Sequence, residues 1–202
     1  MNNLLELNRR TALKTIGGGL LVGAMAGSAN AGGDDLSHEL NEVRAATRKY
    51  RNVGLARDDG YGELVSPYEP EMGFHFVNPD LIAADEDGPF KLTEPPILVY
   101  FTTGNYDPEP FEEHDSERDG DLRLGGVEFA HVGDRDVLDE SSDPDEGTPA
   151  DIFSDEEANR NLKVSEEEGW EWVPPAKVTA IHAWVHRGNP AGVFNPTNPT
   201  ID

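Results

Sequence analysis

The sequence predicts an α+β domain, in which an N-terminal helix packs on an antiparallel sheet or a half-open β-barrel of roughly four to six strands. Two observations support this fold class. Apolar residues recur at helical spacing over residues 36–51, and from Tyr61 onward the apolar runs are short and separated by Pro, Gly and Asp. The first pattern is typical of an amphipathic helix, and the second is typical of strands joined by turns.

The predicted helix covers Leu36 to Arg51. Acidic residues lie at its start and basic residues at its end, which is the arrangement that the helix dipole favours. We expect it to end at Asn52-Val53-Gly54 or, if it runs on, no later than Asp58-Asp59-Gly60. Its apolar stripe is formed by Leu36, Leu40, Val43, Thr47 and Tyr50.

Four runs have the composition of strands. The turn sequence Asp119-Gly120-Asp121 precedes the third of them, so the second and third runs are expected to pair antiparallel. These runs cover residues 74–77, 96–101, 122–132 and 178–186.

Residues 32–202 are expected to form a single domain that carries a long acidic excursion. The excursion, at about residues 133–169, is dominated by Asp, Glu, Ser and Pro, with Ile152-Phe153 as its apolar pair. We interpret it as a surface segment with a short helix at Ser154 to Leu162.

Residues 1–31 have the features of a cleaved signal for the twin-arginine export pathway. Arg9 and Arg10 are followed by an apolar residue three positions on and then by Lys14. A weakly apolar, glycine-rich stretch from Thr15 to Gly27 comes next, and Ala29-Asn30-Ala31 supplies small residues for cleavage. The pattern predicts a secreted, extracellular protein without stable membrane insertion after the signal is removed.

The charge of the chain is typical of a protein adapted to high salt. There are 40 acidic residues against 16 basic ones, for a net charge of −24, and the acids are spread along the chain. At molar salt the Debye length falls to about 3 Å, so this self-repulsion is screened. The same charge argues against nucleic acid and anionic membranes as partners. The chain has no cysteine, so a bound metal would need His, Asp or Glu ligands.

Three short blocks carry a resemblance to a known family. They are Met72-Gly73-Phe74-His75-Phe76-Val77-Asn78-Pro79, Gly126-Val127-Glu128, and His182-Ala183-Trp184 followed by Asn189-Pro190-Ala191-Gly192. On these blocks the chain resembles a family of uncharacterised prokaryotic proteins, many of them exported. The resemblance implies one domain and brings no established activity.

The candidate site residues lie in three of the predicted strands. In an extended strand the side chain of His75 lies opposite those of its phenylalanine neighbours, and Glu128 follows an apolar residue. In the last strand His182, Trp184 and His186 share one face. We therefore predict that His75, Glu128 and His182 bind a divalent metal ion, which could be Zn, Fe, Mn or Ni. His186 and Trp184 are candidates for an additional ligand or a pocket wall.

The alternative interpretation is structural. In it the two histidines are partly buried and hydrogen-bonded to the backbone, and Glu128 is exposed. The sequence thus leaves three function classes open, and whether the protein is an enzyme is undecided. The first is an exported, salt-adapted domain that binds a metal or small ligand in a His-lined pocket. The second is a metal-dependent hydrolase or oxygenase that uses the same site. The third is a surface interaction protein without a metal.

Overall fold

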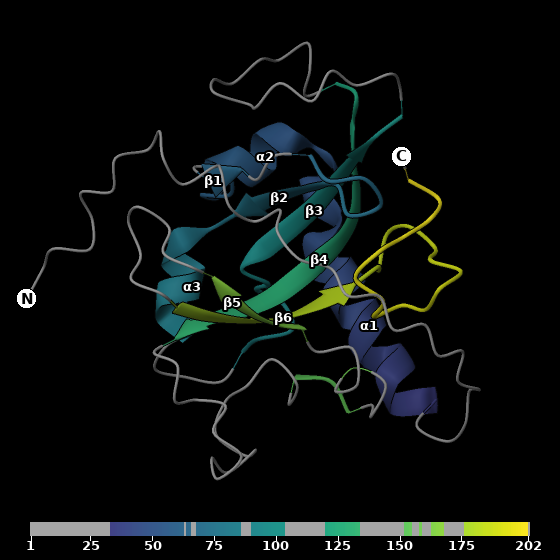
Figure 1. Cartoon of the computed structure of the whole chain (residues 1–202). Coiled ribbons are helices and arrows are strands. Elements are labelled where there is room, and N and C mark those ends of the chain that lie inside the picture. The colour runs from purple at the N-terminus through teal and green to yellow at the C-terminus, as the bar shows by residue number, and fades with distance from the viewer. Residues whose placement is uncertain are drawn as a thin grey trace, which may run out of the picture.

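A computed structural model describes residues 33–62, 64–65, 68–85, 90–103, 120–133, 152–154, 158, 163–167 and 176–201. The predicted α+β class is confirmed, with N-terminal helical segments followed by an antiparallel sheet (Figure 1). The helical elements are α1 (Gly33–Thr47), the 3-10 helix η2 (Arg48–Arg51), α2 (Val53–Asp58) and α3 (Pro79–Asp85). The strands are β1 (Leu64–Val65), β2 (Phe74–Val77), β3 (Ile97–Thr102), β4 (Leu122–Gly133), β5 (Lys163–Glu167) and β6 (Ala176–Ala183).

The strands form one open sheet in the order β1-β2-β3-β4-β6-β5. Every neighbouring pair is antiparallel, including the pair β3 and β4 that the turn at residues 119–121 predicts. The register of that pair shifts between Val99 and Tyr100, which is a bulge of the kind that increases local twist. The strands β1 and β5 lie at the two edges, so the described sheet is open and not a closed barrel.

The helix predicted at residues 36–51 corresponds to two helical elements, and a separate short helix follows it. α1 ends at Thr47, η2 continues to Arg51, and Asn52 then adopts an extended conformation with φ −92° and ψ 106°. The side chain of Asn52 accepts a hydrogen bond from the backbone N–H of Gly54 at 3.0 Å. Asn52 is therefore the N-cap of α2, and the first helical segment ends at the first of the two predicted positions.

The two faces of the sheet carry separate apolar clusters. One face packs against the helices, and its cluster includes Phe74, Phe76, Val127, Phe129 and Ile181 together with residues of α1, η2 and α2. The other face carries two smaller clusters, one formed by Val77, Ile97, Ala130 and Ala180 and the other by Val99, Phe101, Trp184 and Ile201. Because side chains alternate between faces along a strand, the residues next to Phe74, Phe76, Val127 and Phe129 project to the second face.

Part of the predicted acidic excursion belongs to the folded domain. Residues 163–167 form β5, which pairs with β6, and Phe153 is 3% exposed within the main apolar cluster. The prediction of a purely surface segment is therefore corrected for these residues. Apart from Ser154 and Ala158, the helix expected at 154–162 lies outside the described residues.

The last strand is shorter than the sequence predicts. β6 ends at Ala183, because the N–H of Val185 donates back to the carbonyl of Ala183 at 2.9 Å. The N–H groups of His186 and Arg187 then both donate to the carbonyl of Gly125, at 3.0 and 2.9 Å. The chain thus turns away from the strand direction before it reaches His186.

The segment after β6 is held by asparagine side chains. The amide of Asn189 donates to the carbonyls of Asn195 and Thr197, and the amide of Asn198 donates to the carbonyl of Gly188. The backbone N–H of Asn198 also donates to the carbonyl of Glu71 at 2.7 Å. This bond ties the C-terminal segment to the turn that precedes β2.

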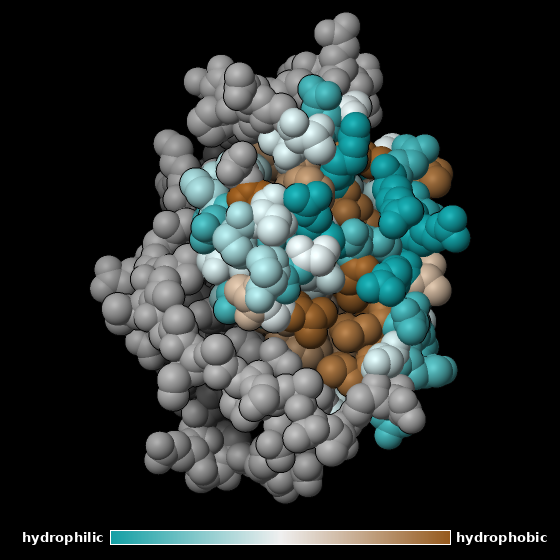
Figure 2. All heavy atoms as spheres, turned by 90° about the vertical axis from the view of Figure 1, so that its right-hand side faces the viewer, coloured by the Kyte–Doolittle hydropathy of each residue, from teal (hydrophilic) through white to brown (hydrophobic). Residues whose placement is uncertain are grey.

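The surface of the described residues is largely polar. Figure 2 shows the face that carries α1 and the C-terminal segment, where hydrophilic residues cover the upper part and apolar residues gather lower down. Leu36, Leu40, Ile152 and Val193 are partly buried residues packed against the main cluster. No helix in the described part of the chain is long and apolar enough to cross a membrane.

Substitution of Gly73 tests how closely the turn before β2 must pack against β3. It has a φ of +86°, and a Cβ there would lie 2.3 Å from the carbonyl oxygen of Tyr100. We expect Gly73→Ala to lower the free energy of unfolding by at least about 2 kcal/mol, since it combines a left-handed backbone with a clash against backbone. Denaturant unfolding in high salt measures this. Gly188→Ala is the control, because a Cβ at Gly188 meets nothing within 4 Å; equal losses in both variants would contradict the prediction.

Candidate metal centre

Three strands position the three predicted ligands on the second face of the sheet. Glu128 on β4 and His182 on β6 are direct cross-strand partners. His75 on β2 is the partner of Val99 on β3, and β3 in turn separates β2 from β4. Partners across an antiparallel pair project to the same face, so the register of β2, β3, β4 and β6 brings residues from distant parts of the sequence to one place.

The side-chain atoms of the three residues converge. The Nε2 atoms of His75 and His182 are 3.1 Å apart, and Nε2 of His75 is 3.4 Å from Oε2 of Glu128. Nδ1 of His182 is 3.8 Å from Oε1 of Glu128. One ligand atom from each residue can be chosen so that all three lie within 4.8 Å of one another. The sequence-based prediction that these three side chains share a site is therefore met in its geometry.

All three side chains are buried, which differs from the alternative interpretation in which Glu128 is exposed. His75, Glu128 and His182 are 2%, 8% and 3% exposed. Burial lowers the pKa of His75 to about 4. Burial also raises the pKa of Glu128 to about 8, and the charge of Glu69 adds to that increase. Both shifts have the same cause, since removal from water disfavours the charged form of each group.

Apolar residues enclose the centre on its face of the sheet. The two small clusters around Ile97 and around Phe101 occupy this face, and the ring of Trp184 is stacked on that of His182, with centroids 6.0 Å apart and planes at 16°. The indole N–H of Trp184 donates to the carbonyl of Asn195 at 2.6 Å. The C-terminal segment therefore fixes the ring that packs against one of the candidate ligands.

His186 is separate from this group. Thr47 uses its hydroxyl proton in a 2.7 Å bond to the carbonyl of Val43, so the 2.8 Å contact between Thr47 Oγ1 and His186 Nε2 has the histidine as donor. Burial lowers the pKa of His186 to about 4, and Arg51 and Arg44 contribute. The structure thus places His186 against α1, whereas Trp184 packs directly on a candidate ligand.

Glu69 is an acidic residue outside the three candidate ligands, and the sequence did not single it out. It lies in the turn before β2, where Glu69 and Gly73 form an isolated antiparallel bridge. Burial is the main cause of the raised pKa of Glu128, and the charge of Glu69 adds to it. One acid among 40 carries no distinguishing pattern, so only the register of the turn could have revealed it.

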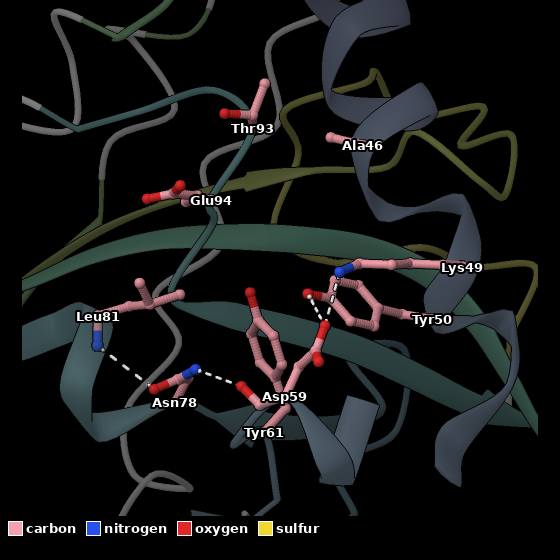
Figure 3. Close-up of a pocket in the computed structure, with 9 residues that line it drawn as sticks. All are labelled: Ala46, Lys49, Tyr50, Asp59, Tyr61, Asn78, Leu81, Thr93 and Glu94. Carbon is pink, nitrogen blue, oxygen red and sulfur yellow. Dashed lines mark hydrogen bonds and ion pairs between the residues drawn. The ribbon is translucent and has the colours of Figure 1, made fainter. Parts of the chain in front are cut away.

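A pocket of about 380 Å³ lies elsewhere and is not lined by histidine (Figure 3). Lys49 and Asp59 form an ion pair of 2.6 Å at its wall, and Tyr50 donates to the same carboxylate at 3.0 Å. Asn78 donates to the carbonyl of Asp59 and accepts bonds from the first turn of α3. These polar groups hold the helices and turns together. The histidines of the predicted His-lined pocket do not line this cavity and lie instead in the packed cluster on β2 and β6.

Comparisons with known protein families, with curated proteins and with solved structures find no match to this chain. The family resemblance noted in the sequence therefore stays a prediction.

The shifted pKa values predict how the stability of the metal-free protein depends on pH. Between pH 6.5 and 8 the unfolded chain has already ionised Glu128, whereas the folded protein keeps it protonated up to about pH 8. The folded state then binds more protons, so the free energy of unfolding should fall as pH rises through this window, by up to about 1.4 kcal/mol per pH unit. His75 and His186 contribute the opposite slope only below pH 6.5, since their pKa values are lowered.

Denaturant unfolding at constant high salt, with a chelator present, measures this slope. Glu128→Gln should remove it between pH 6.5 and 8, because the amide does not titrate. An unchanged slope in Glu128→Gln would assign the pH dependence to other groups.

Proposed function

We propose that the protein binds a divalent transition-metal ion through His75, Glu128 and His182. The observation that supports this most directly is the convergence of one ligand atom from each residue within 4.8 Å in a buried setting. Buried ionisable groups are unfavourable unless they are paired or coordinate a metal. A cation placed among the three side chains would satisfy the carboxylate and both imidazoles at once.

The distances agree with a shared ion. Metal–ligand bonds of about 2.0–2.1 Å place neighbouring ligand atoms about 2.8–3.4 Å apart in octahedral or tetrahedral geometry. Two separations here lie in this range, 3.1 Å between the two imidazoles and 3.4 Å between His75 and Glu128, and that between Glu128 Oε1 and His182 Nδ1 is longer at 3.8 Å. Two imidazoles and one carboxylate suit Zn, Fe, Mn or Ni.

Three protein ligands leave coordination positions for water or a small molecule, in contrast to closed structural sites. The side chain of Glu128 retains 11% exposure, compared with 2% and 3% for the histidines. An exchangeable ligand would therefore approach from the side of the carboxylate. The same open positions would serve a metal-dependent hydrolase or oxygenase, in which the ion activates its bound water or ligand.

Metal binding by this centre should be tested by titrating Zn(II) or Co(II) into chelator-treated protein in high salt. We expect one ion per chain in the wild type. His75→Ala, His182→Ala and Glu128→Gln should each weaken binding by more than about 100-fold, because even residues outside the coordination shell change affinity by about 10- to 100-fold. Affinity should also rise with pH, because the ion must displace the proton that burial keeps on Glu128.

His38→Ala is the matched control, since His38 is an exposed histidine on α1. Its affinity should equal that of the wild type. Absence of stoichiometric metal in the wild type, or equal affinity in all four variants, would remove the proposed function and favour a surface interaction protein without a metal.

We also propose that the protein is exported by the twin-arginine pathway and acts outside the cell. The support is the ordered series of paired arginines, a weakly apolar stretch and small residues in positions 1–31. The acidic composition, with a net charge of −24, is in accord with a protein exposed to concentrated salt.

Replacement of both signal arginines tests this export. The double variant Arg9→Lys, Arg10→Lys keeps the charge of the segment and removes the residue pair that the pathway recognises. We expect the precursor to accumulate inside the cells and the shorter mature form to disappear from the medium, as measured by immunoblotting of the two fractions. The single change Lys14→Arg is the control, and secretion of the double variant at the wild-type level would contradict the assignment.

A further inference from the structure

Three arginines form a row along one face of the first helical segment. Arg44 lies in the last turn of α1, Arg48 begins η2 four residues later, and Arg51 ends η2 three residues after that. Residues four apart in an α-helix, or three apart in a 3-10 helix, lie above one another on the same face. All three residues are exposed. We call this surface the arginine row.

The arginine row lies in a part of the chain without acidic residues. Residues 43–57 contain no Asp or Glu, although 40 of the 202 residues of the chain are acidic. The segment after β6 packs beside the row, where Nε of Arg44 donates to the carbonyl of Val185 (Figure 1). Residues 184–201 of that segment contain no Asp or Glu either. A basic surface is therefore present on a strongly acidic chain.

The arginines of the row are not neutralised by nearby acids. Within the described residues no carboxylate forms an ion pair with any of the three. Lys49, which lies between Arg48 and Arg51 in the sequence, does form such a pair, 2.6 Å from Asp59. Ion pairing is thus available to a cation of this segment, and the row does not use it.

The helix dipole explains only part of this arrangement. Basic residues near the C-terminus of a helix interact favourably with its last carbonyls, which accounts for the sign of the charges. Like charges three or four residues apart on a helix repel, however, and Arg44, Arg48 and Arg51 have this spacing. Departures from such local rules are expected at functional surfaces.

The spacing of the row matches that of an extended acidic chain. The rise per residue, about 1.5 Å in an α-helix and about 2.0 Å in a 3-10 helix, separates successive arginines by about 6 Å along the axis. Alternate residues of an extended strand share a face and are about 6.6–6.8 Å apart. Carboxylates at alternate positions would therefore meet successive guanidinium groups, each of which can donate two parallel hydrogen bonds to a carboxylate.

We propose that the arginine row is a docking site for an acidic protein segment, which binds in an extended conformation with Asp or Glu at alternate positions. A short acidic segment adds little long-range repulsion to a chain with a net charge of −24. Duplex nucleic acid, in contrast, carries a charge about every 1.7 Å along its axis. This docking site does not involve the metal centre, so the two proposals are independent.

Binding of short synthetic peptides tests the proposed spacing. The probe is a fluorescently labelled Thr-rich peptide with three Asp residues at alternate positions. The control peptide has the same composition, but its Asp residues are consecutive, so only two of them share a face. Fluorescence anisotropy is measured at the lowest salt concentration at which circular dichroism shows folded protein, because salt screens exposed ion pairs. We expect the alternating peptide to bind at least about threefold more tightly.

Replacement of single arginines tests which cations bind the peptide. Arg48→Gln and Arg51→Gln should each weaken binding of the alternating peptide by about 3- to 5-fold, and the double variant by about 10- to 25-fold. Thermal unfolding should show unchanged stability, since neither side chain forms an ion pair within the described residues. Arg123→Gln is the matched control, because Arg123 is an exposed arginine on β4 outside the row; it should change the affinity by less than about twofold.

Three results would overturn the proposal. Equal affinity of the wild type and the double variant for the alternating peptide would exclude the row as its binding site. Equal affinity of the wild type for the two peptides would exclude the extended, alternating arrangement. Tighter binding of a short duplex DNA than of the alternating peptide, with the DNA binding lost in the double variant, would assign the row to nucleic acid instead.

Discussion

The cost of placing ionisable groups inside the domain governs this structure. A carboxyl group and two imidazoles lie on a sheet face between small apolar clusters, in positions where valine or isoleucine would be the ordinary choice. Water no longer stabilises their charges there, so each group is driven toward its neutral form unless a counter-charge is present. The close packing around the centre, including the stacked ring of Trp184, is compatible with such groups only because they satisfy one another or share a cation.

The remaining parts of the fold serve to hold these groups in register. One face of the sheet packs against the helices. The large apolar cluster between the helices and the sheet fixes the positions of the strands. The segment after Ala183 then crosses back and connects the two histidine-bearing strands through Trp184 on one side and Glu71 on the other. The centre is therefore positioned by backbone hydrogen bonds and packing, which makes its geometry a property of the whole domain.

Much of the fold could be predicted from local pattern. The alternation of apolar residues predicts the strands around Phe74 and Val127. The turn near Gly120 correctly predicts that β3 pairs with β4. Local pattern fails where a single side chain or a tertiary contact decides the outcome. β5 was missed because an edge strand of polar composition has no apolar signal until it pairs with β6.

The same distinction applies to the site. Once a strand is recognised, successive side chains are known to point to opposite faces of the sheet. This alternation was enough to place His75, Glu128 and His182 on the face opposite the main core. The sequence could not show that Glu128 is buried, because that depends on what covers the sheet. It also could not show that the chain turns before His186, since that depends on backbone hydrogen bonds to the distant Gly125.

The separation of the two histidines has a consequence for biosynthesis. His75 and His182 are 107 residues apart, and β6 is the last strand of the sheet to be made. The chain must close a long loop before these side chains meet, so a growing polypeptide on the ribosome holds only two of the three side chains until β6 has been made. Assembly of the cluster is therefore a late event in the formation of the sheet.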